Sequence, residues 1–256
     1  MPFLEQRRAA RMACALPARL YGRGSDLDGT VEDVSRIGIR LSLPLASLCE
    51  GPGVDMLHLA RAVEAYLGPR FNLDLNPEML GPLVRKRLRI VRIGQDRDKP
   101  DALELGGEFG VPLSEDESRM LELNLPPLGH VPPLPVRTGR RSQRYEAYLH
   151  PSAGHRSAPL AGTSSAPEAG RALFHASRAT GLDVRAPDVT TLALALAGAF
   201  GPEPVLELRR GTVQIWSGRT RIQHIETAAP ASSEVRVHVR ACDVPGFGAR
   251  RGAGTA

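Results

Sequence analysis

The sequence is poor in aromatic residues and cysteine, and it has no long apolar run. Aromatic side chains make up 4 % of its 256 residues, and no uninterrupted apolar stretch reaches the roughly 20 residues that a membrane-spanning helix needs. The most apolar stretch, 191–201, predicts a buried helix. The N-terminal segment has arginines where a signal peptide would have its apolar region. We therefore expect no membrane insertion and a cytoplasmic location.

The three cysteines, Cys14, Cys49 and Cys242, are an odd number and lie far apart in the chain. This pattern favours reduced thiols over a disulfide framework or a zinc site. The histidines of the second half show no spacing typical of metal ligands. No glycine-rich phosphate loop, nucleophile elbow or pair of catalytic carboxylates is present. We therefore predict that the protein is not an enzyme and carries no metal or cofactor.

Lysine is almost absent, since Lys86 and Lys99 are the only lysines among 33 basic residues. Residues 1–128 hold 17 basic and 19 acidic side chains, whereas residues 129–256 hold 16 basic and 9 acidic ones. The high isoelectric point therefore comes from the second half. The basic runs of this half lack stacking aromatic residues, and Trp216 is the only tryptophan, which argues against nucleic-acid binding.

The chain repeats itself. Residues 7–11 (RRAAR) return as 140–144 (RRSQR), and residues 59–69 return as 192–202, both at an offset of 133 residues. Such internal similarity predicts a tandem duplication of one domain. A proline-rich stretch separates the copies, and prolines favour an extended spacer. We predict domains at 1–125 and 138–244, a linker at 126–137 and a disordered tail at 245–256.

Short, partly alternating apolar runs separated by Gly, Asp, Asn and Pro predict an antiparallel sheet or small barrel. In the first copy these runs are 16–20, 30–34, 37–43, 71–75, 88–93 and 103–109. The fold class is therefore mainly β with short helices, as two tandem antiparallel β-barrels.

Each copy is predicted to carry one inserted helix. Apolar residues at helical spacing follow Asp55, a candidate N-cap, and Gly68-Pro69 ends this helix. Its counterpart in the second copy is apolar almost all round and should be buried. A capping box, Ser114-x-x-Glu117, predicts a further helix after the first barrel.

Two motifs of the first copy carry the functional signal. Arg7-x-x-x-Arg11 lies at the entrance to the first strand, and Asp33-x-Ser35-x-x-Gly38 lies between two later strands. Together with the strand that ends at Ile93 and with residues 105–109, they resemble the PilZ domain, a bacterial receptor module for cyclic di-GMP. The resemblance covers about residues 5 to 125.

The resemblance implies that cyclic di-GMP is the ligand. Arginines can chelate phosphate and stack on a base, and a carboxylate can accept the N–H groups of guanine. The implied ligand-binding residues are Arg7, Arg8, Arg11, Asp33, Ser35 and Gly38. The alternative is that the arginines form a solvated arm and that the second motif is a turn closed by side-chain hydrogen bonds.

The second copy departs from the motif. With Gly170 aligned to Gly38, Ser165 stands at the position of Asp33 and Pro167 at that of Ser35, although Arg140 and Arg144 persist. The acceptor for guanine is missing, so we predict an interaction or scaffold role for this copy.

Three functions follow, in order of preference. The first is a non-enzymatic cyclic di-GMP effector that binds the messenger through its N-terminal PilZ-like domain and signals to an unidentified protein partner. The second is a PilZ-like adaptor that binds no nucleotide. The third is a nucleic-acid binder that uses the basic second half.

Overall fold

A computed structural model describes residues 11–48, 54–75, 85–95, 99, 101–124, 144–166, 168, 170–177, 188–227 and 234–242. Two compact units make up the chain. One comprises 1–139 with 186–194, and the other comprises 140–185 with 195–256. The predicted linker at 126–137 lies outside the described residues, as does the predicted tail at 245–256.

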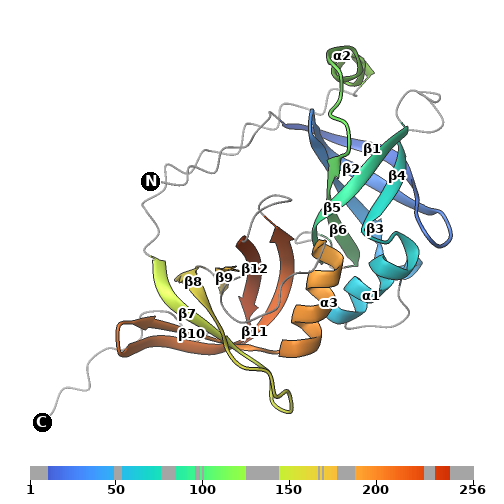
Figure 1. Cartoon of the computed structure of the whole chain (residues 1–256). Coiled ribbons are helices and arrows are strands. Elements are labelled where there is room, and N and C mark those ends of the chain that lie inside the picture. The colour runs from blue at the N-terminus through green and yellow to red at the C-terminus, as the bar shows by residue number, and fades with distance from the viewer. Residues whose placement is uncertain are drawn as a thin grey trace, which may run out of the picture. The chain divides into compact units, whose positions relative to one another are not determined.

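Unit 1 is a closed barrel of six antiparallel strands (Figure 1). Neighbouring strands pair in the order β5-β4-β1-β2-β3-β6, and β6 pairs back with β5 to close the ring. The strands are β1 (Arg11–Tyr21), β2 (Leu27–Ser35), β3 (Gly38–Pro44), β4 (Arg70–Leu75), β5 (Arg85–Gln95) and β6 (Ala102–Phe109). The barrel predicted from alternating runs is therefore confirmed for this unit.

The alternation explains why these segments form a barrel. Successive side chains of a strand point to opposite faces, so every second residue enters the interior. On β1 the buried residues are Cys14, Leu16, Ala18 and Leu20, while their neighbours are more exposed. The other strands follow the same rule and fill the barrel with leucine, isoleucine, valine and phenylalanine.

The helices begin where their capping residues predict. In α1 (Met56–Tyr66) the Asp55 side chain accepts a hydrogen bond from the backbone N–H of His58 at 3.0 Å. Ahead of α2 (Glu115–Asn124), Ser114 and Glu117 bond reciprocally, side chain to backbone, as a capping box requires. A short 3₁₀ helix, η1 (Leu45–Ser47), follows β3.

Unit 2 closes a second six-stranded ring, and its strand order is β10-β7-β8-β9-β12-β11, with β10 and β11 also paired. The helix α3 (Val189–Phe200) lies in the chain between β9 and β10, just as α1 lies between β3 and β4. The strands are β7 (Arg144–His150), β8 (Leu160–Ser165), β9 (Arg171–Ser177), β10 (Val205–Arg210), β11 (Val213–Thr227) and β12 (Glu234–Ala241).

Details of the two inserted helices also agree. Asp188 caps α3 through the backbone N–H of Thr191 at 2.9 Å, as Asp55 caps α1. Gly68 and Gly201, which follow these helices, have φ angles of 69° and 72°, a left-handed conformation that glycine adopts without strain. Tandem duplication stays a prediction, which these parallels support. Among the described residues no helix is both long and apolar enough to span a bilayer.

Candidate functional site

The Asp-x-Ser-x-x-Gly motif forms the hairpin between β2 and β3. Arg36 and Ile37 make a two-residue turn, so Ser35 and Gly38 are directly paired. The Ser35 hydroxyl accepts from the Gly38 backbone N–H at 3.2 Å and donates to the Gly38 carbonyl at 3.0 Å. Ser35 is itself buried. In this structure Ser35 closes the turn.

Gly38 is required by the approach of the neighbouring strand. A Cβ atom added at this position would lie 2.4 Å from the carbonyl oxygen of Gly107 on β6. Its backbone is not in the left-handed region. Of the two roles expected for this glycine, close backbone approach and positive φ, the structure supports the first.

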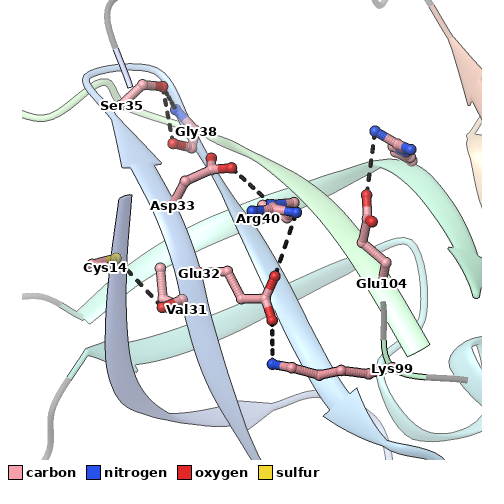
Figure 2. Close-up of polar contacts among 10 residues, drawn as sticks. Cys14, Val31, Glu32, Asp33, Ser35, Gly38, Arg40, Lys99 and Glu104 are labelled. Atoms are coloured by element: carbon pink, nitrogen blue, oxygen red, sulfur yellow. Dashed lines mark hydrogen bonds and ion pairs between the residues drawn. The ribbon is translucent and has the colours of Figure 1, made fainter. Parts of the chain in front are cut away.

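A β-bulge between Val31 and Asp33 brings two carboxylates to one arginine. Val31 pairs with Leu41 and Asp33 pairs with Arg40, so β2 has one residue more than β3 across this stretch. Arg40 donates from Nε to Asp33 Oδ2 at 2.8 Å, and its Nη1 lies 3.4 Å from Glu32 Oε2. Figure 2 shows both acidic side chains directed at the guanidinium group.

Further ion pairs surround this arginine. Lys99 Nζ lies 2.6 Å from the other oxygen of Glu32, and Arg92 on β5 pairs with Glu104 on β6 at 3.2 Å. Burial by itself lowers the pKa of Arg40, but the carboxylates of Asp33, Glu32 and Glu104 outweigh burial and raise it above its ordinary value. Arg40 is therefore a permanent cation within a group of acidic side chains.

The first strand brings the arginine motif to this hairpin. Arg11 is the first residue of β1, and its backbone pairs with that of Ser35, while Ala13 pairs with Asp33. Arg7 and Arg8 lie outside the described residues. Strand pairing therefore joins the end of the Arg-x-x-x-Arg motif to the Asp-x-Ser-x-x-Gly motif.

Arg40 and Glu32 were not predicted as site residues, although a signal for Arg40 was available. In a hairpin with a two-residue turn, residues at equal distances from the turn lie opposite each other. Asp33 and Arg40 are equidistant from the turn at Arg36 and Ile37, so their pairing follows from the turn length. The contact of Glu32 depends on the bulge, for which the sequence had no signal.

The turn is also tied to the segment that leads to α2. Arg36 donates from Nε to the Leu113 carbonyl at 3.2 Å, and its own carbonyl accepts from the Leu113 N–H at 2.8 Å. Lys86 on β5 pairs with Glu117 at 2.6 Å. The hairpin and β5 are thus both bonded to the segment at the start of α2.

Cys14 lies beside this hairpin, and its Sγ is 3.4 Å from the Val31 carbonyl (Figure 2). Burial, followed by the nearby Asp33 carboxylate, raises the pKa of this thiol to about 11. Cys14 is therefore an uncharged core residue, and Cys14 and Cys242 are both free thiols.

Strand pairing corrects the alignment of the second copy by one residue. Gly38 pairs with Glu108, and Arg171 pairs with Arg240, so Arg171 and not Gly170 takes the position of Gly38. The residues that then correspond to Asp33, Ser35 and Arg40 are, in this order, Ala166, Glu168 and Leu173. The corrected alignment also lacks a carboxylate at the Asp33 position.

The arginine motif was also misaligned. Ala18 pairs with Leu75 on β4, and Ala147 pairs with Leu208 on β10, so β7 follows β1 at an offset of 129 residues. The loop between β7 and β8 is longer than its counterpart and absorbs the difference. Arg144 therefore does not take the position of Arg11. Arg140 takes it, and Arg140 lies outside the described residues.

Comparison with known proteins agrees with the barrel and its motifs. The sequence profile of the PilZ domain family matches residues 5–124. This part of the chain is a PilZ domain. No curated protein sequence matches the chain.

Three solved structures are similar to parts or most of the chain. MotI/DgrA, an inhibitor of motility from Bacillus subtilis, is 16 % identical over 47 % of this chain and 50 % of its own, with a TM-score of 0.32. PlzA from Borreliella burgdorferi, in complex with c-di-GMP, is 9 % identical over 91 % of this chain and 86 % of its own, with a TM-score of 0.31. MrkH from K. pneumonia, also in complex with c-di-GMP, is 16 % identical over 47 % of this chain and 51 % of its own, with a TM-score of 0.27. The matches to MotI/DgrA and MrkH thus span about half the length of those proteins.

Proposed function

We propose that the PilZ domain of unit 1 is a receptor for cyclic di-GMP and that the protein is a non-enzymatic bacterial effector in the cytoplasm. The ligand would bind where β1 begins beside the β2–β3 hairpin. The observation that carries this proposal is the backbone pairing of Arg11 with Ser35, which brings the two motifs of the PilZ resemblance together.

The chemistry of this region suits a cyclic dinucleotide. The ligand presents two phosphates and two guanines, and Arg7, Arg8 and Arg11 would supply permanently charged, planar donors for phosphate and base. Asp33 would accept N–H groups from the Watson–Crick edge of a guanine. Ser35 and Gly38 would act mainly by shaping the turn that presents Asp33, since Ser35 bonds to Gly38 and Gly38 admits β6.

Unit 2 would be a degenerate copy that makes protein contacts. Its hairpin has Ala166 and Leu173 in place of Asp33 and Arg40, so it lacks both the guanine acceptor and the cation beside it. Ligand bound at unit 1 would then change the surface that the chain offers to a protein partner.

The test is an isothermal calorimetric titration of the full chain with cyclic di-GMP. We expect saturable binding that Arg11→Ala and Asp33→Ala each weaken at least tenfold, about 1.4 kcal/mol. Matched controls lie on the same strands. Arg19 and Asp28 form an exposed ion pair at 3.0 Å on β1 and β2, and Arg19→Ala or Asp28→Ala should leave the affinity unchanged.

Two results would overturn the proposal. If the folded wild-type chain shows no binding, the protein is better described as an adaptor that binds no nucleotide. If binding occurs and both site variants keep the wild-type dissociation constant, the ligand binds elsewhere.

A further inference from the structure

Arg40 occupies a position from which it can set the orientation of the Asp33 carboxylate. Its Nε–H donates to Asp33 Oδ2 at 2.8 Å, and the same guanidinium group reaches Glu32 at 3.4 Å. Two contacts from one planar group restrict rotation of that group. The Asp33 side chain is only 14 % exposed, so solvent competes weakly for its carboxylate.

Arg40 is itself held from several sides. Glu32, one of its partners, is also bonded to Lys99 at 2.6 Å. Glu104, whose side chain is 5 % exposed, contributes negative charge from β6 and is paired with Arg92. Figure 2 shows Glu32 between Arg40 and Lys99, so the contacts extend from β2 and β3 to the segment before β6.

The charges explain why a cation is needed at this point. The bulge places two carboxylates, Asp33 and Glu32, on neighbouring residues that face one arginine. Like charges this close repel each other, so without a cation between them the Asp33 side chain would rotate away from Glu32. A rotated Asp33 would be a poorer acceptor for the N–H groups of guanine. Arg40 offsets that repulsion and keeps the carboxylate oriented.

Unit 2 lacks both members of the pair. By strand register Ala166 stands at the Asp33 position and Leu173 at the Arg40 position, although the surrounding strands pair in the same way. The barrel therefore closes without this ion pair, and general fold stability does not account for it.

We infer that Arg40 is a positioning residue of the cyclic di-GMP site, which holds Asp33 in the orientation that accepts a guanine edge. The inference rests on the proposed function and adds the residue that sets guanine recognition.

The test is a double-mutant cycle on the full chain, with cyclic di-GMP titrated into wild type, Arg40→Ala, Asp33→Ala and the double variant. We expect Arg40→Ala to weaken binding about tenfold. In the Asp33→Ala background the same change should have no further effect, because Arg40 acts through Asp33. Arg40→Lys keeps the charge beside Asp33 and should recover part of the affinity.

A matched control is Arg85→Ala, which removes another arginine of unit 1 from a bidentate pair with Asp74, with both N–O distances 2.9 Å. It should leave the dissociation constant unchanged. Circular dichroism melting of each variant checks that it is folded. If Arg40→Ala alone does not fold, Arg40→Lys and Arg40→Gln take its place, with Gln expected to bind more weakly than Lys.

The outcomes separate this inference from the proposed function. An absence of wild-type binding overturns both. Wild-type binding that Asp33→Ala weakens and Arg40→Ala does not overturns the positioning role alone. An equal loss from Arg40→Ala in both backgrounds also overturns that role, because Arg40 would then contact the ligand directly.

Discussion

The hairpins β2–β3 and β8–β9 occupy equivalent places in two barrels of the same strand order, yet only the first carries a charged cluster. Asp33 and Arg40 pair across the first hairpin, whereas Ala166 and Leu173 stand at these positions in the second. The barrel closes in both units. The difference teaches that strand pairing and interior packing build the scaffold, and that the polar residues of the hairpin are a separate addition.

The strands β4 and β10 show the opposite behaviour, because an ion pair is present on both. Asp74 pairs with Arg85 and Glu207 pairs with Arg209. Each arginine also lies over a tyrosine ring, Arg85 over Tyr21 at 5.5 Å and Arg209 over Tyr148 at 5.0 Å. The two units therefore agree on this outer face and differ at the hairpin.

The largest effect is expected from the interiors. Leu75 and Leu208 occupy equivalent buried positions on β4 and β10. Because truncation removes buried methyl groups and leaves a cavity, Leu75→Ala and Leu208→Ala should each cost about 2–5 kcal/mol of unfolding free energy. Denaturant unfolding measures both, with the exposed Val111→Ala as control. A large cost in one unit only would show that the two interiors are not comparable.

A smaller effect should separate the hairpin glycine from its counterpart. Gly38→Ala places a Cβ atom 2.4 Å from the Gly107 carbonyl and should cost about 1–3 kcal/mol. Arg171 at the equivalent position is exposed, so Arg171→Ala should change stability by less than about 0.5 kcal/mol. Thermal melts of both variants decide this. Equal melting temperatures would contradict the close approach of β6.

Ligand binding tests the hairpin difference directly. Arg144→Ala in unit 2 should leave both the stoichiometry and the dissociation constant for cyclic di-GMP unchanged, whereas Arg11→Ala should cost about 1.4 kcal/mol, a factor of ten. Calorimetry of the full chain gives both quantities. A stoichiometry of two that falls to one in Arg144→Ala would assign a second site to unit 2.

The smallest effect concerns pH and should be common to both units. Hydrogen bonds from Arg85 lower the pKa of Asp74, and a hydrogen bond from Arg209 lowers the pKa of Glu207. Both folded-state pKa values lie below those of the unfolded chain. The stability from these pairs is therefore complete above the ordinary carboxyl pKa of about 4 and is lost as the pH falls through the folded pKa.

Carboxyl-carbon NMR titration from neutral to acid pH measures these two pKa values. Asp74→Asn and Glu207→Gln should each reduce the acid dependence of the melting temperature. A titration midpoint above the ordinary value at either residue would remove that residue from the comparison.

Much of the fold could be predicted from local sequence signals. The six strands of the first barrel follow period-two alternation, and Asp55 and Ser114 mark the starts of α1 and α2. The one local error in the barrel is Ile37, predicted as strand and found in the turn. These signals succeed because capping and alternation depend on residues a few positions apart.

Long-range register was less accessible. The repeated arginines at 7–11 and 140–144 suggested an offset of 133 residues, but strand pairing gives 129 for β7. A loop of different length shifts one strand along the sequence without changing its place in the barrel. Sequence similarity over five residues cannot detect such a shift, whereas the pairing of Ala147 with Leu208 does.

By itself the sequence determined the barrel class, the helix starts and the motifs that suggested a PilZ domain, because each depends on neighbouring residues. Only the tertiary structure decided that Asp33 lies beside Arg40 and Glu32. That cluster depends on a one-residue bulge in β2, on the length of the turn and on Lys99 from a distant segment. A bulge changes which side chains share a face, and its position follows from the packing of the whole barrel.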